Sequence, residues 1–203
     1  GLPSIITMGL SSLTSFFINQ ILLAYSTTAT AVYGIWMKLQ NFCFMPIFGL
    51  NNGMVPILSY NYGTGRRDRV KEAMRIALTG CAVLMCMLLI VLELVPGVIL
   101  TLFSAGEQMR DIGMVCIRAC VISLPFAAVS MILSTSMQAL DHSRYAMLIN
   151  MMRQCVLLVA SFLGISMLTH SQKLIWLAVP VTEIITFLVS LRLYGLFHRH
   201  LDM

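Results

Sequence analysis

The sequence predicts an all-α fold, a polytopic membrane helical bundle with six transmembrane helices. The chain is 59% hydrophobic and only 10% charged, with a mean hydropathy of +0.89, which is the balance of a membrane protein. No charged residue occurs in residues 1–37, 76–92 or 119–140. A spanning helix needs roughly 20 mainly apolar residues, and these runs lack the alternating polarity of barrel strands. Each run is therefore expected to hold a spanning helix.

Turn and charge signals divide the chain into six expected spans, with boundaries accurate to a few residues: residues 4–25, 33–60, 74–96, 112–140, 146–169 and 174–197. The first span is uncharged, and it does not resemble a signal peptide because it lacks a basic segment before its long apolar run. An even number of spans places both termini on one side of the membrane.

The third span follows a turn-rich segment, residues 59–65, and a run of five cations. These cations are Arg66, Arg67, Arg69, Lys71 and Arg75. We expect residues 66–75 to form a short interfacial helix that anchors the chain, with Val70, Ala73, Met74 and Ala77 on its apolar face.

The cations also predict the orientation of the spans. Nine lie on the side of this segment and three on the other, with Lys38 inside the second span. Short loops rich in Lys and Arg stay in the cytoplasm, so both termini are expected to be cytoplasmic in a protein of the cell membrane. This bias explains the net charge of +5 without nucleic-acid binding, which we do not expect.

The second span combines polar residues with prolines, which kink a helix, and with glycines, which allow close packing between helices. Polar groups at membrane depth are costly and usually have a task, so we expect Lys38, Gln40, Asn41 and Asn52 to line a cavity. Pro46 and Pro56 predict a kink, and the spacing of Gly49 and Gly53 predicts close packing on a neighbouring helix.

The sixth span carries Glu183, expected roughly 15 Å deep in the membrane, with Pro180 one turn before it. Desolvation there would favour its protonated form, so Glu183 could carry a proton or meet a cationic substrate. Alternatively, it is paired structurally with Arg153 or Lys38, or bonded by a hydroxyl. The fourth span repeats the pattern with Pro125 and ends at Gln138.

No motif predicts an enzyme. The sequence contains no His-Glu-x-x-His, Gly-x-Ser-x-Gly or Gly-x-x-x-x-Gly-Lys-Ser/Thr. Its six cysteines include no Cys-x-x-Cys pair, so we expect neither a metal site nor a cofactor. Without a phosphate-binding loop, any transport would depend on an ion gradient or a partner.

Read in order, several segments resemble the C-terminal lobe of a MATE (multidrug and toxic compound extrusion) transporter. They are Gly1-Leu2-Pro3, Asn19, Tyr33-Gly34-Ile35, Pro46, Gly49, Gly53, Pro56-Ile57, Ser59-Tyr60-Asn61-Tyr62-Gly63, Arg69-Val70-Lys71-Glu72-Ala73, Gln138-Ala139-Leu140, Arg153-Gln154, Pro180 and Glu183. The resemblance covers essentially the whole chain.

The resemblance implies one lobe of a two-lobe antiporter, and we expect the N-terminal lobe to be missing from this chain. Such transporters export cationic or amphipathic compounds in exchange for protons or sodium by alternating access. The resemblance also implies structural or gating roles for the prolines, for Gly49 and Gly53, and for Gln138 and Arg153. Partners would be the bilayer, a small-molecule substrate and the other lobe.

The chain departs from the family pattern at the positions that would bind an ion. Asn19 lies where the first lobe of the family carries a proton-linked Asp, and an amide cannot titrate. The first and fourth spans also lack the carboxylates that some members use for sodium, so protons are favoured as the coupling ion. Two alternatives remain: a lipid-linked oligosaccharide flippase of the same superfamily, and a membrane assembly module that does not transport.

Overall fold

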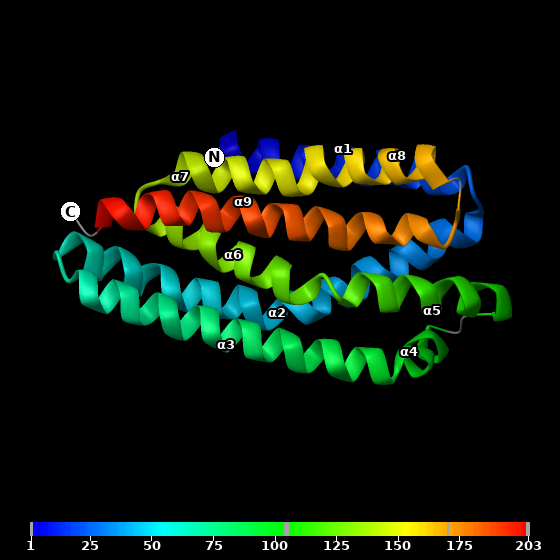
Figure 1. Cartoon of the computed structure of the whole chain (residues 1–203), viewed down its shortest axis with the longest axis horizontal. Coiled ribbons are helices and arrows are strands. Elements are labelled where there is room, and N and C mark those ends of the chain that lie inside the picture. Colours follow the sequence, from blue (N-terminus) through cyan, green and yellow to red (C-terminus); the bar gives the residue numbers. More distant parts are fainter. Residues whose placement is uncertain (1, 104–105, 170, 202–203) are drawn as a thin grey trace.

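The computed structural model of this chain is an elongated bundle of helices (Figure 1). It describes the backbone of residues 2–103, 106–169 and 171–201, and the side chains of residues 9–103, 106–169 and 171–196. No residue in these ranges belongs to a strand. The elements are α1 (Leu2–Leu23), α2 (Thr27–Gly63), α3 (Arg67–Leu94), α4 (Pro96–Leu102), α5 (Glu107–Val121), α6 (Leu124–Ala139), α7 (Ser143–Met151), the π-helical turn η1 (Met152–Leu157), α8 (Leu158–Thr169), the 3-10 turn η2 (Leu174–Leu177) and α9 (Ala178–Leu201).

Four helical segments among the described residues are long and apolar enough to cross a membrane: Thr27–Gly63, Arg67–Leu94, Ser143–Thr169 and Leu174–Leu196. The pair α5 and α6 makes a fifth if it is counted as one span, and Gly9–Leu23 of α1 is apolar but shorter. The chain is thus an all-helical membrane bundle, and its expected six spans correspond to α1, α2, α3, the α5–α6 pair, the α7–η1–α8 run and the η2–α9 run.

The second span begins six residues earlier than the sequence reading placed it, at Thr27 instead of residue 33. Ser26 caps this helix: its hydroxyl oxygen accepts a hydrogen bond from the Ala29 N–H at 3.0 Å. The same oxygen accepts a 2.8 Å bond from the Gln172 side chain, which joins the α1–α2 turn to the turn before α9.

The prediction of a separate interfacial helix at residues 66–75 was wrong. Arg67–Leu94 is one continuous helix, because no Gly or Pro interrupts the chain between the cations and the apolar run. Its predicted apolar face is real, since Val70, Met74 and Ala77 are buried. The α2–α3 turn lies at the same end of the bundle as the α6–α7 turn and the end of α9 (Figure 1).

The fourth span is broken, and the two parts, α5 and α6, are bent by 45°. Pro125 lies in the first turn of α6, where its ring prevents α5 from continuing. Ser123 is fully buried at the break, and both its N–H and its hydroxyl donate to the Cys120 carbonyl, at 3.0 and 2.6 Å. The break is therefore satisfied internally, as lipid surroundings require.

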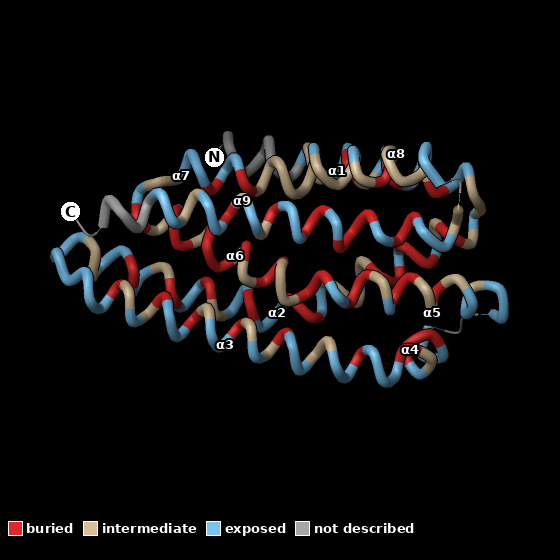
Figure 2. Tube along the Cα trace, in the orientation of Figure 1, coloured by how far each residue is buried: buried red, intermediate tan, exposed pale blue. Residues whose placement is uncertain are grey.

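Helix α6 is the centre of the lobe. It contacts α2, α3, α7 and α9, and the buried residues in Figure 2 gather along these facing surfaces. Small residues let the helices approach, and the hydroxyls among them are bonded: Ser130 and Ser136 donate to carbonyls one turn back at 2.8 and 2.7 Å. Ser134 instead donates to the Ala146 carbonyl of α7 at 3.3 Å.

The turn after α2 depends on a glycine. Gly65 has φ +72°, in the left-handed region that side chains with a Cβ disfavour. The Arg66 N–H donates to the Asn61 carbonyl at 2.9 Å and the Gly65 N–H donates to the Tyr62 carbonyl at 3.0 Å, which is a Schellman end.

We therefore expect Gly65→Ala to lower the free energy of unfolding by about 1 kcal/mol. The matched control is Gly63→Ala, because Gly63 is the last residue of α2 and a methyl group there meets no described atom within 4 Å. This control should be neutral or slightly stabilising. Thermal unfolding of the purified native polypeptide in detergent measures both, and an equal loss in the two variants would contradict the role of the turn.

Candidate functional site

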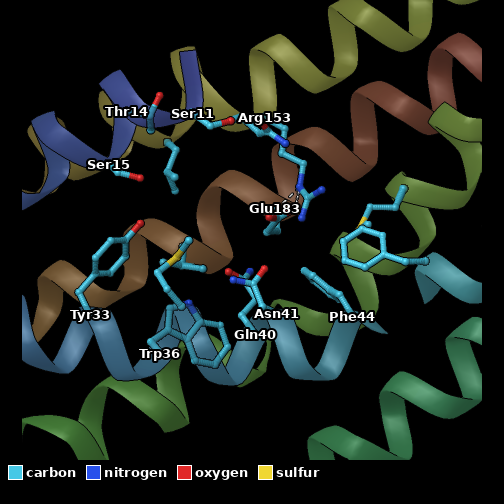
Figure 3. A pocket seen from close by; sticks show the side chains of 16 residues that line it. Ser11, Thr14, Ser15, Tyr33, Trp36, Gln40, Asn41, Phe44, Arg153 and Glu183 are labelled. Atoms are coloured by element: carbon cyan, nitrogen blue, oxygen red, sulfur yellow. Dashed lines mark hydrogen bonds and ion pairs between the residues drawn. The ribbon is translucent and has the colours of Figure 1, made fainter. Parts of the chain in front are cut away.

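Two cavities adjoin inside the lobe. The central cavity, of about 300 Å³, is lined by Ser11, Thr14, Ser15, Tyr33, Trp36, Met37, Gln40, Asn41, Phe44, Phe48, Met131, Arg153, Gln154, Leu158, Val179 and Glu183 (Figure 3). The amide-rich cavity, of about 750 Å³, is lined by Phe48, Asn51, Asn52, Val55, Ser59, Met131, Thr135, Gln138, Ala139, Asn150, Arg153 and Gln154. Four residues line both: Phe48, Met131, Arg153 and Gln154.

One face of α2 runs along both cavities. With about 3.6 residues per turn, side chains three and four positions apart share a face. The lining residues of α2 follow this spacing in order: Tyr33, Trp36, Met37, Gln40, Asn41, Phe44, Phe48, Asn51, Asn52, Val55 and Ser59. The face is aromatic with two amides in the central cavity, and polar beyond Phe48.

The structure separates the polar residues predicted to line a cavity. Gln40 and Asn41 line the central cavity, and Asn52 lines the amide-rich cavity. Lys38 and Asn19 are exposed and line neither. Lys38 is displaced because it lies two positions before Gln40, which turns it more than half a helix turn away from the cavity face.

Glu183 and Arg153 form the charged pair of the site. The Arg153 Nε donates to both carboxylate oxygens of Glu183 at 2.9 Å, and the two side chains are only 12% and 7% exposed. The guanidinium carbon also lies 5.7 Å from the ring centre of Phe44, within cation–π range. Among the described residues Glu183 is the one buried carboxylate, and the alternative in which it pairs with Arg153 is the one observed.

The ion pair also corrects the predicted position of Arg153. The sequence predicts Arg153 among the nine cations on the cytoplasmic side, but it lies within the lobe on η1, where it faces α9. A π-helical turn inserts an extra residue into the helix and re-aims the side chains around it. Gln154 follows on the same turn, and its Oε1 accepts a 2.7 Å bond from the Ser11 hydroxyl of α1. The wide turn thus connects α9 on one side and α1 on the other.

The amide-rich cavity contains polar side chains that have not found partners. Asn51 is only 8% exposed, and its Oδ1 reaches no hydrogen-bond partner in the described part of the chain. Among the described residues that line this cavity none is acidic, and the only charged side chain is Arg153. The amide and guanidinium N–H groups can donate hydrogen bonds to a ligand, and the Asn51 Oδ1 can accept one.

Gly49 and Gly53 do not pack closely on another helix within the described part of the chain. Both are exposed, and a methyl group at either would meet no described atom within 4 Å. Helix α2 passes Pro46 and Pro56 without ending. Pro180 lies in the first turn of α9, where its missing N–H has no cost.

Several residues that line the central cavity were not predicted from the sequence. Ser11, Thr14 and Ser15 lie at helical spacing on α1 and face the central cavity, and Tyr33, Trp36 and Phe44 do so on α2. Their spacing was the available signal, but in an apolar span such a stripe also fits simple packing. Gln138, predicted from the end of the fourth span, does line the amide-rich cavity. In the described ranges no three His, Cys, Asp or Glu residues cluster as metal ligands would.

Comparison with known proteins gives consistent matches. The sequence profile of the MatE family matches residues 3–163. The multidrug export protein MepA of Staphylococcus haemolyticus is 24% identical over 199 residues, which are 98% of this chain and 44% of that protein. MepA of Staphylococcus aureus strain MSSA476 is 22% identical over 163 residues, which are 80% of this chain and 36% of that protein. The chain spans less than half the length of these relatives.

Solved structures show the same fold. An outward-facing multidrug resistance MATE transporter of the MOP superfamily superposes with a TM-score of 0.92 at 16% identity, over all of this chain and 46% of that protein. The bent form of the MATE transporter VcmN of Vibrio cholerae gives 0.91 at 16% identity, over 98% of this chain and 45% of that protein.

Removing one member of the ion pair should destabilise the lobe. Arg153→Gln leaves the Glu183 carboxylate buried without a counter-charge, and we expect it to lower the free energy of unfolding by about 3 kcal/mol or more. The double variant Arg153→Gln with Glu183→Gln should recover most of this loss. Arg118→Gln is the control, because Arg118 is exposed and should have little effect. Thermal unfolding in detergent is the measurement, and equal losses in the single and double variants would contradict the pairing.

Proposed function

This chain belongs to the MatE family, and we propose that it is one lobe of an antiporter that exports cationic or amphipathic drugs and toxic compounds. The lobe would alternate between inward-open and outward-open states around its central cavity. The relatives that support this are named multidrug export proteins, and the chain matches 44% of the length of one of them.

The observation that carries the proposal is the central cavity beside a buried ion pair. A mixed lining of aromatic rings, methionines and amides suits amphipathic ligands of varied shape, because such side chains offer apolar contact and adaptable hydrogen bonds. An intramembrane carboxylate next to that cavity is where a coupling ion and a ligand can affect each other.

The ion pair favours protons over sodium as the coupling ion. Both oxygens of Glu183 accept from Arg153, so a sodium ion would have to displace the guanidinium and find further oxygen ligands. A proton needs only one carboxylate oxygen. Its binding would remove the charge that holds Arg153 and would release the η1 turn from α9.

The partner we propose is a second six-helix lobe, related to this one by a two-fold axis along the membrane normal. The solved relatives are about twice the length of this chain, which supports the proposal. We place the cationic end of the bundle, with Arg66, Arg67, Arg69 and Arg75 exposed and Lys71 half-buried, on the cytoplasmic side of the cell membrane.

The other functions have less support. An assembly module would have Lys38, Gln40, Asn41 and Glu183 tied off in internal pairs without a cavity between them. Glu183 is paired with Arg153, but Gln40 and Asn41 line a cavity. A flippase for an oligosaccharide diphosphate would be expected to have several cavity cations, and of Lys38, Arg118 and Arg153 only Arg153 lines either cavity.

Efflux tests the proposed coupling. In inverted membrane vesicles that carry the native polypeptide, an imposed pH gradient should drive ethidium transport, and Glu183→Gln should reduce the gradient-driven rate at least roughly tenfold because the amide cannot bind the coupling proton. Glu93→Gln changes an exposed glutamate at the end of α3 and should leave the rate unchanged. Unchanged pH-driven efflux in the Glu183→Gln variant would contradict the proposed role of Glu183 as the proton carrier.

A further inference from the structure

Arg153 has hydrogen-bonding capacity that its partner does not use. Only its Nε bonds to Glu183, and within the described part of the chain its two terminal nitrogens donate to no group. A guanidinium binds a carboxylate best through a pair of parallel N–H donors. The side chain lines both cavities, so a ligand in either can reach it.

The surroundings of Arg153 on the amide-rich side suit a negative group. The described residues that line this cavity include no Asp or Glu, and Glu183, the carboxylate bonded to Arg153, lines the central cavity instead. Five amides line this cavity, those of Asn51, Asn52, Gln138, Asn150 and Gln154, and their N–H groups can donate to the oxygens of a carboxylate.

The central cavity offers the complementary apolar half. Trp36, Phe44 and Phe48 lie along one face of α2, and Phe48 and Met131 form the boundary with the amide-rich cavity. Together the cavities provide space in the range that holds drug-sized ligands. A molecule with an aromatic body and an acidic end could place its body against these rings and its acidic end at Arg153.

We propose that Arg153 and the amide-rich cavity form a binding site for the carboxylate of an amphipathic organic acid whose apolar body occupies the central cavity. This site goes beyond the proposed export of cationic and amphipathic compounds, and it depends on the cavity but not on transport. The bound carboxylate accepts from the terminal nitrogens of Arg153 and from the amides.

Glu183 opposes this binding, so the proposal predicts the direction in which ligand affinity changes when the charge of Glu183 is removed. Its carboxylate shares the guanidinium with the ligand, and two like charges on one cation repel. Removing the charge of Glu183 should therefore tighten the binding of an organic acid. A purely structural role for the Arg153–Glu183 pair predicts no such gain.

Three fluorescent ligands with one aromatic body test the site: dansylglycine, which carries a carboxylate, neutral dansylamide, and dansylcadaverine, which carries an ammonium group. Their fluorescence is titrated against the purified native polypeptide in detergent. We expect dansylglycine to bind roughly tenfold more tightly than dansylamide, as one charge-assisted pair allows. Glu183→Gln should increase the ratio of dansylglycine affinity to dansylamide affinity several-fold.

The double variant Arg153→Gln with Glu183→Gln removes both charges and should abolish the preference for dansylglycine, while Arg118→Gln should preserve it. Retained dansylamide binding shows that each variant keeps its apolar cavity. Equal affinities for dansylglycine and dansylamide in the unaltered protein, or a preference that survives in the double variant, would overturn the proposal. If Arg153-dependent binding is found without ethidium efflux, the proposed transport fails and the proposed site stands. If efflux is found but dansylglycine is not preferred over dansylamide, the proposed site fails and the proposed transport stands.

Discussion

The lobe depends on the rule that a charge inside a membrane must have a partner. Arg153 and Glu183 are both nearly buried, and an isolated charge at that depth costs several kcal/mol or more. The pair therefore fixes the η1 turn against α9, and Phe44 of α2 adds a ring contact to the guanidinium. Three separate segments of the chain are held at one point, and both cavities open beside it.

The π-helical turn is the local means by which the pair is made. Arg153 and Gln154 are adjacent on this turn and have partners on different helices: Arg153 pairs with Glu183 of α9, and Gln154 accepts from Ser11 of α1. The turn has no proline or glycine to cause it, so tertiary contacts select it. A turn held by contacts and not by sequence is also one that can change when a contact is lost.

The sequence predicted what periodicity and composition control. The all-helical membrane bundle, the cavity positions of Gln40 and Asn41, and Glu183 as the buried carboxylate follow from local pattern and from the cost of polar groups in lipid. Lys38 does not line either cavity with Gln40 and Asn41, because residues that are close in sequence do not all lie on the same face of a helix. Gly49 and Gly53 have no close neighbour within the described residues, because a motif shows two small residues but not what they face. The wide turn at Arg153 has no signal in its own residues.

In the proposed antiporter, the ion pair would couple ligands of different charge to protons in different ways. A cationic ligand beside Glu183 would compete with a proton for the same carboxylate, so protonation would expel it, and such competition is what exchange requires. A carboxylate on Arg153 instead competes with Glu183 for the guanidinium, so protonation of Glu183 would hold it more tightly; by linkage the bound acid would favour the protonated lobe equally. A single buried pair would then drive the export of cations, while organic acids that occupy the same cavities would act against it.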